Sequence, residues 1–138
     1  MSDPDAKTIV RRWATAWNQG DVEAAVALLS PAYVRHDANL PEVVGPDAEK
    51  QFMQGVLAAF SGLEIATQAI LADGDLVAVR LVVSGRHVGE FLGIPATAQQ
   101  VRFLSHEFFR VEGGKLAEQW VVMDVAGLLQ QLGAIPKS

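Results

Sequence analysis

Two carboxylates in the last third of the chain interrupt segments that are otherwise apolar. Glu107 lies in VRFLSHEFFRV (101–111), and Asp124 directly follows the apolar run WVVM (120–123). A low-dielectric environment disfavours the charged form of a carboxyl group and raises its pKa towards neutrality. Such a group can take a proton from a substrate and give one back. We therefore predict that Asp124 and Glu107 are the catalytic residues.

Each of these residues also has a structural interpretation. Asp124 precedes a predicted short helix, so its side chain could cap the free backbone N–H groups of that helix, a role compatible with catalysis. Glu107 could lie at the rim of a site, paired with an arginine. His87 is expected on the core face of its strand, where a lone histidine is more often a hydrogen-bonded structural residue than a catalyst.

Three helices are predicted to precede the strands that carry these residues. Asp3-Pro4 resembles a helix cap followed by proline at the first helical position, and Gly20 ends that helix. Asp21 begins the second helix, and Ser30-Pro31 stops it.

A loop is expected over residues 33–44, before Gly45-Pro46 begins a third helix that closes near Gly62. Apolar residues recur along these helices at helical spacing and are most simply core; they include Trp13, Trp17, Phe52, Val56 and Phe60.

From Leu63 onward, apolar residues alternate as they do in strands, and ADGD (72–75) and EGGK (112–115) are typical of hairpin turns. A short helix ended by Gly133 follows the last strand. Helices followed by antiparallel strands predict an α+β domain in which the helices cover the apolar face of the sheet. A strongly curved sheet leaves a pocket beneath them. The predicted inward-facing residues of the first three strands are Leu63, Ile65, Thr67, Ala69, Leu71; Val77, Val79, Leu81, Val83, His87; and Val101, Phe103, Ser105, Glu107, Phe109, Val111.

The pairing of the last two strands decides whether the two carboxylates meet. A two-residue turn at Gly113-Gly114 pairs Glu107 with Trp120 and Phe103 with Asp124, so that both acids point into one interior. A slip of one residue would turn one strand over, and a wider turn or a bulge would also change this register.

Composition narrows the classes of function. The 138 residues fit one domain (1–138), and a net charge of −5 without a basic cluster argues against nucleic acid or an anionic membrane as partner. The absence of cysteine excludes disulfides, thiolate catalysis and cysteine-ligated zinc. No signal peptide or membrane-spanning run is visible, so we expect a cytoplasmic protein.

No cofactor is predicted. HEFFR at His106 lacks the second histidine of the H-E-x-x-H zinc motif and lies on a strand, so no metal site is expected. The glycines of SGRHVGEFLG (84–93) are not flanked by the strand and helix of a dinucleotide-binding unit.

Several longer motifs point to a family. They are GRHVGEFLGIPAT (85–97), FFRVEGGKLAEQWVVMD (108–124) and GLLQQLG (127–133), supported by YVRHD (33–37) and GPDA (45–48). In these segments the chain resembles the SnoaL-like polyketide cyclases of the nuclear-transport-factor-like superfamily. The resemblance implies a cone-shaped fold: a curved antiparallel sheet, three N-terminal helices closing a deep pocket, and a short C-terminal helix.

The resemblance also implies a reaction, the cofactor-free intramolecular aldol closure of a ring in a polyketide ester. A positioned carboxyl group and a hydrogen-bond donor for the enolate oxygen would suffice for it. In our alignment with the cyclases, the histidine of their His–Asp pair falls on Glu107 and their acid–base aspartate on Val121. A second acid of their terminal strand falls on Asp124. Either Asp124, with Glu107, has taken over proton transfer, or the protein does other chemistry. The residues expected to bind a small hydrophobic carbonyl substrate are His36, His87, Trp120, Phe52, Phe103 and Trp17.

Other functions fit the same sequence. The protein could be another acid–base enzyme of this fold, an isomerase or an epoxide hydrolase, or a non-catalytic domain that binds a small ligand. It could also be a dimeric scaffold that uses the outer face of the sheet, and family resemblance makes a homodimer or higher homo-oligomer plausible. The arginines predicted on that outer face, which otherwise form a solvated surface, are Arg80, Arg86, Arg102 and Arg110.

Overall fold

The structure, a computed structural model, describes residues 5–136. Helix α1 (Ala6–Gln19) begins at Asp5, whose side chain accepts a hydrogen bond from the backbone N–H of Thr8. The cap predicted at Asp3-Pro4 lies outside the described residues. The other helices are α2 (Val22–Ala27), α3 (Pro46–Ala59) and α4 (Val125–Gln131).

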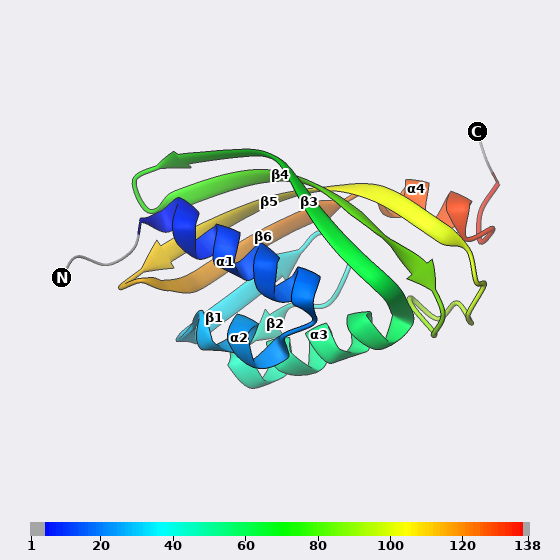
Figure 1. Cartoon of the computed structure of the whole chain (residues 1–138), viewed down its shortest axis with the longest axis horizontal. Helices are drawn as coiled ribbons and strands as arrows, with labels where there is room; N and C mark the ends of the chain where they lie inside the picture. The colour runs from blue at the N-terminus through cyan, green and yellow to red at the C-terminus, as the bar shows by residue number, and fades with distance from the viewer. Residues whose placement is uncertain (1–4, 137–138) are drawn as a thin grey trace.

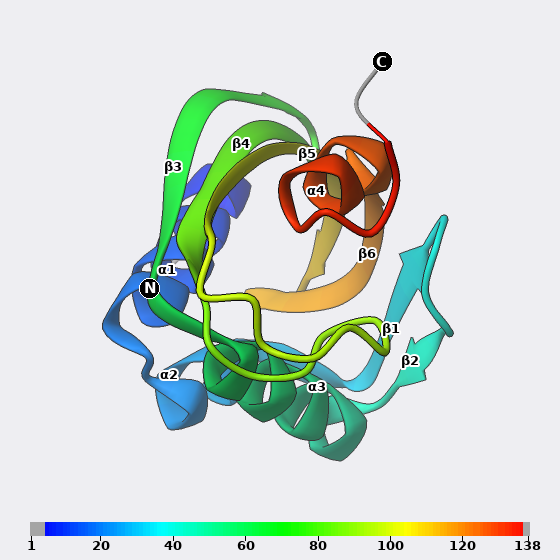
Figure 2. The same ribbon diagram turned by 90° about the vertical axis from the view of Figure 1, so that its right-hand side faces the viewer.

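One curved, open sheet wraps around the interior, in the order β2-β1-β6-β5-β4-β3 (Figures 1 and 2). All neighbouring strands are antiparallel except β1 and β6, which run parallel, so the sheet is mixed rather than purely antiparallel. The predicted α+β class is confirmed. The strands are β1 (Leu29–Asp37), β2 (Val43–Val44), β3 (Phe60–Asp73), β4 (Leu76–His87), β5 (Gln100–Glu112) and β6 (Lys115–Met123).

The loop predicted over residues 33–44 is wrong, because β1 and β2 occupy most of it. Helix α2 also ends earlier than predicted, and Ser30 and Pro31 belong to β1. Pro31 lies between Leu29 and Val34, where the ladder to β6 is irregular. A proline without an N–H group is tolerated where the ladder is interrupted, so it does not stop the strand.

The third predicted helix also ends early, at Ala59, and Phe60 is the first residue of β3. Further along β3, the pairing with β4 shifts between Thr67 and Ala69. Because a one-residue shift exchanges the two faces of a strand, Ile70 packs against the core while Leu71 is 71% exposed. The predicted inner face of this strand is therefore correct only at its start.

The register of β5 and β6 also differs from the predicted one, because β6 contains a bulge. Glu112 pairs with Lys115 as expected, but Ala117 is an extra residue in β6, and beyond it Glu107 pairs with Val121 instead of Trp120. The alternation of β6 is thereby reversed. The inward-facing residues of the strand are Gln119, Val121 and Met123.

Helices α1 and α3 pack against the concave face of the sheet (Figures 1 and 2). Trp13 of α1 meets Phe109 of β5 edge to face, with ring centroids 4.8 Å apart, in a core that also contains Ile9 and Val77. Helix α4 lies at one end, where Leu128 packs with Val101. The helices therefore close one side of the hollow that the sheet encloses.

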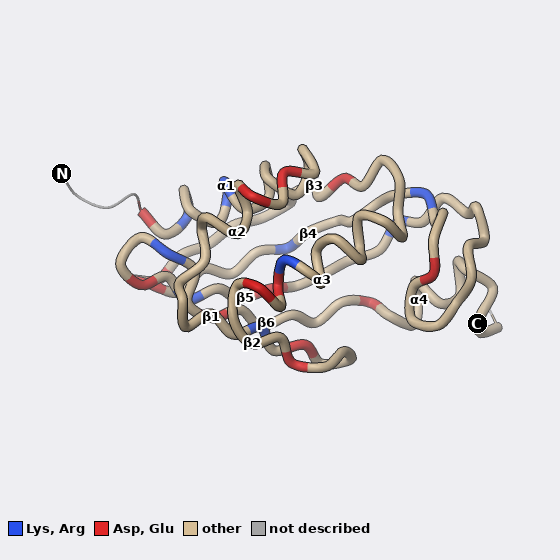
Figure 3. Tube along the Cα trace, turned by 90° about the horizontal axis from the view of Figure 1, so that it is seen from below, with Lys and Arg blue, Asp and Glu red and all other residues tan. Residues whose placement is uncertain are grey.

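Lysine and arginine positions are spread over the described chain and do not gather in one patch (Figure 3). Arg80, Arg86 and Arg102 are exposed on the convex face of the sheet, as predicted. No helix formed by residues 5–136 combines the length and the apolar character needed to span a membrane.

Candidate active site

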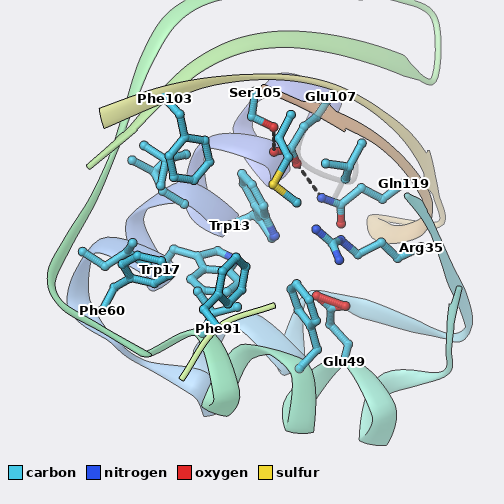
Figure 4. Close-up of a pocket in the computed structure, with 17 residues that line it drawn as sticks. Trp13, Trp17, Arg35, Glu49, Phe60, Phe91, Phe103, Ser105, Glu107 and Gln119 are labelled. Atoms are coloured by element: carbon cyan, nitrogen blue, oxygen red, sulfur yellow. Dashed lines mark hydrogen bonds between the residues drawn. The ribbon is translucent and has the colours of Figure 1, made fainter. Parts of the chain in front are cut away.

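A cavity lies between α1, α3 and the concave face of the sheet. Its wall is mainly aromatic and aliphatic, and Figure 4 shows the polar side chains gathered on one side of it. These polar residues are Arg35, Glu49, Ser105, Glu107 and Gln119. A wall of this kind binds an apolar molecule and directs a few polar groups at chosen atoms.

Glu107 is the most buried acid of the cavity wall. It is 6% exposed, and both of its carboxyl oxygens accept hydrogen bonds, Oε2 from the Ser105 hydroxyl at 2.8 Å and Oε1 from the Gln119 amide at 2.6 Å. Burial raises the pKa of Glu107, while the Arg35 charge and these two hydrogen bonds oppose the rise. Burial therefore favours the acid form of this group, whereas Arg35 and the two hydrogen bonds favour its carboxylate.

Glu49 reaches the same cavity from α3. It lies one turn before Phe52 on the buried stripe of the helix and is 7% exposed. Its Oε2 lies 3.3 Å from the Tyr33 hydroxyl, which also donates to Gln119 Oε1 at 2.6 Å. Burial raises the pKa of Glu49 to about 7, against the opposing effect of Arg35. A second proton donor or acceptor thus faces Glu107.

Arg35 of β1 supplies the positive charge of the site. Its guanidinium carbon lies 4.1 Å from the centroid of the Phe52 ring, and Nη2 lies 3.4 Å from Asp37 Oδ2. Within the described chain, Nη1 is buried and has no hydrogen-bond partner. Because a buried donor without a partner is costly, an oxygen of a bound molecule would be stabilised there.

The structure places the predicted site residues in two groups. Glu107, Trp17, Phe52 and Phe103 line the cavity. Asp124 does not: it is exposed, and its Oδ1 accepts a hydrogen bond from the Gly127 N–H at 2.9 Å as the N-cap of α4. The prediction that both acids point into one interior is wrong, because the bulge changes the register.

His36, Trp120 and His87 are not part of the cavity wall either. His36 stacks on Trp120 with ring centroids 5.6 Å apart, on the other face of the sheet from Arg35. Its Nε2 lies 2.6 Å from Glu118, a contact that raises the pKa of His36. His87 is fully buried, as its predicted core position required, and its Nδ1 lies 2.9 Å from Thr97 Oγ1.

Sequence reasoning missed much of the polar cluster. Tyr33, Arg35 and Asp37 alternate along one face of β1, but their polar side chains give no apolar strand pattern. Glu49 extends the stripe of Phe52 and Val56 backwards by one helical turn, but a glutamate near a helix start is usually solvated. Around these residues, and throughout positions 5–136, no group of three His, Cys, Asp or Glu side chains is placed to hold a metal ion.

Comparisons with known proteins agree with this architecture. The profile of the SnoaL-like polyketide cyclases matches residues 7–132. The aklanonic acid methyl ester cyclase DnrD of Streptomyces peucetius is 30% identical over 131 residues, covering 91% of this chain and 88% of its own. The nogalonic acid methyl ester cyclase of Streptomyces nogalater is 32% identical over 106 residues, covering 76% of each chain.

Among solved structures, AclR of Streptomyces galilaeus superimposes with a TM-score of 0.86 at 33% identity, covering 96% of this chain and 83% of its own. The family match extends from α1 to the end of α4 and includes every element that contributes to the cavity. The chain therefore belongs to the SnoaL-like polyketide cyclase family.

Proposed function

We propose that the protein is an ester cyclase that closes a ring in a polyketide substrate by an intramolecular aldol reaction in the cavity described above. One observation carries the proposal: on one wall of a mainly apolar cavity, two buried carboxyl groups flank a guanidinium group whose Nη1 has no hydrogen-bond partner among residues 5–136. Two relatives named above are cyclases of aklanonic acid methyl ester and of nogalonic acid methyl ester. A substrate of this class has apolar rings and a C–H group made acidic by neighbouring carbonyls.

The reaction uses a base, a donor for the enolate oxygen and an acid. Glu107, as a carboxylate, takes the proton from the carbon between two carbonyls. Arg35 Nη1 holds the enolate oxygen that forms. The enolate carbon then attacks the ketone carbon of the same molecule, a carbon–carbon bond forms, and the new alkoxide takes its proton from Glu49. The product has the mass of the substrate, and no co-reactant is consumed.

The placement of Glu107 accounts for a departure from the family pattern. The family resemblance assigns the acid–base aspartate to position 121, which is valine here. In the observed register Val121 is the direct cross-strand partner of Glu107, and the side chains of such partners lie about 5 Å apart. We propose that the acid has moved across the ladder, from β6 to β5, while serving the same part of the cavity. Asp124, outside the cavity, takes no part in the reaction.

Glu107→Gln tests the base, and Arg35→Met tests the oxyanion donor. The purified protein is incubated with aklanonic acid methyl ester and with nogalonic acid methyl ester, and ring closure is followed by chromatography, since the mass does not change. Loss of a general base reduces kcat by about 10²–10⁴-fold, and loss of an oxyanion donor by about 10²–10³-fold.

Glu64→Gln is the matched control, because it makes the same substitution at an exposed position of β3. It should leave kcat unchanged. Wild-type turnover by Glu107→Gln would refute the assignment of the base. Binding of both esters by the wild-type protein without conversion would instead favour a ligand-binding domain.

A further inference from the structure

A chain of hydrogen bonds joins the two carboxyl groups of the cavity. The Gln119 side-chain amide lies 2.6 Å from Glu107 Oε1 at one end and 2.6 Å from the Tyr33 hydroxyl at the other. That hydroxyl lies 3.3 Å from Glu49 Oε2. All four side chains are buried, none being more than 7% exposed. Water therefore has little access to the groups between the two acids.

The orientation of the Gln119 amide decides which acid carries a proton. Burial raises the pKa of Tyr33, so the phenol stays neutral and has one hydrogen to donate. When the Gln119 nitrogen donates to Glu107, the amide oxygen faces Tyr33 and takes that hydrogen. Glu49 can then bond to the phenol oxygen only as a donor. Because Glu107 accepts hydrogen bonds at both oxygens, from Gln119 and from Ser105, it is a carboxylate in this arrangement, and Glu49 is a carboxylic acid.

Rotating the Gln119 amide by half a turn gives a second arrangement with the same contacts. The amide oxygen now faces Glu107, which must be protonated to donate to it. The amide nitrogen donates to the phenol oxygen, and the phenol donates to Glu49 as a carboxylate. If both acids were ionised, two acceptors would face each other somewhere in the chain, and a buried unsatisfied acceptor is costly. The chain therefore opposes ionisation of both acids at once.

We propose that Gln119 and Tyr33 are positioning residues that keep one proton shared between Glu49 and Glu107. The role of this shared proton in catalysis rests on the proposed function. In the first arrangement Glu107 can accept a proton and Glu49 can donate one, so this arrangement is ready to react. The second arrangement is the one that the reaction leaves behind. Glu107 then releases its proton to solvent, and Glu49 takes one up.

The proposal is distinct from electrostatic repulsion between the two acids. Arg35 and Asp37 are the other charged side chains acting on this pair. These charges, and the repulsion between the acids, are present whether or not Tyr33 has its hydroxyl. Tyr33→Phe therefore breaks the hydrogen-bond chain and leaves the electrostatic part in place.

The test is a double-mutant cycle read by NMR on the full chain without substrate. Glutamate labelled with ¹³C at the side-chain carboxyl is incorporated, and the pKa of Glu49 is measured with and without Glu107→Gln, in the wild-type and Tyr33→Phe backgrounds. Glu107→Gln supplies a permanently neutral partner, so it should lower the pKa of Glu49. We expect the decrease to be larger with Tyr33 present, by about one pKa unit or more, the size of a hydrogen bond to a charged group.

Equal decreases in the two backgrounds would overturn the proposal. If Glu107→Gln does not fold, the reciprocal cycle reads the pKa of Glu107 with and without Glu49→Gln, and the same comparison decides. Ser105→Ala is the matched control: it removes a hydrogen bond to Glu107 outside the chain, so it should raise the pKa of Glu107 and preserve the coupling. Coupling without turnover of either ester would refute the proposed function alone, and turnover without coupling would refute this inference alone.

Discussion

Glu49→Gln should make the protein more stable at pH 8 while removing a carboxyl group from the proposed site. Burial raises the pKa of Glu49 from 4.5 to about 7. The folded chain therefore holds a proton that the unfolded chain releases above about pH 4.5. The free energy of unfolding falls as the pH rises through this interval and levels off above about pH 7.

The size of the effect follows from the shift. At about 1.4 kcal/mol per pKa unit, Glu49 costs the folded state about 3 kcal/mol at pH 8 relative to pH 4. Glutamine has nearly the same shape and stays neutral, so this loss disappears in the variant. Glu107 contributes with the same sign, since its pKa is also raised by burial, and part of the pH dependence therefore remains.

Urea unfolding followed by tryptophan fluorescence measures the effect, because Trp13 and Trp17 are buried beside the cavity. Curves are collected at intervals from pH 4 to pH 8 for the wild type, for Glu49→Gln and for the exposed control Glu64→Gln. The control should follow the wild type. A Glu49→Gln protein whose stability falls with pH as steeply as that of the wild type would refute the reasoning.

Two further outcomes test other parts of the fold. Asp124→Ala should lower the free energy of unfolding by about 1 kcal/mol, the usual effect of losing an N-cap, and should leave ester turnover unchanged. A large loss of kcat without loss of stability would show that Asp124 takes part in the reaction. Gly89→Ala should lower the melting temperature, because its new Cβ would lie 2.7 Å from the Ala58 carbonyl oxygen, and overpacking of this kind costs about 1–3 kcal/mol. Gly55→Ala is the control, with nothing within 4 Å of the added Cβ, and should raise the melting temperature slightly; a drop equal to that of Gly89→Ala would contradict the steric argument.

The regular parts of this fold could be predicted from the sequence because burial imposes a period on them. The inward-facing residues of β4 and β5 could be predicted from the strict alternation of apolar residues, which correctly places His87 and Glu107 inside. The register of β6 did not follow, since the turn at Gly113-Gly114 gives no sign of the extra residue Ala117. One inserted residue was enough to place Asp124 wrongly.

The polar cluster could not be predicted from hydrophobic patterning, because its residues are polar although they lie on the inner face of the sheet. Hydrophobic patterning identifies a strand by its apolar inner face, and β1 carries Tyr33, Arg35 and Asp37 there. Local rules fail at functional sites because the residues there are selected for reactivity, so polar side chains occupy buried positions that patterning assigns to apolar ones. An arginine between two aromatic or acidic residues at alternating positions is the pattern that would have revealed this strand.

The bulge at Ala117 has a consequence for how cavities of this kind diversify. Deleting that residue would join Leu116 directly to Glu118 and leave the pairs of Gln119 with Phe109 and of Val121 with Glu107 in place, so the same side chains would face the cavity. A bulge bends its strand and increases the local twist, so one deleted codon would change the curvature of the cavity wall without exchanging any residue of that wall. Laboratory libraries that vary the strand length at this point would therefore vary the shape of the cavity while keeping its chemistry.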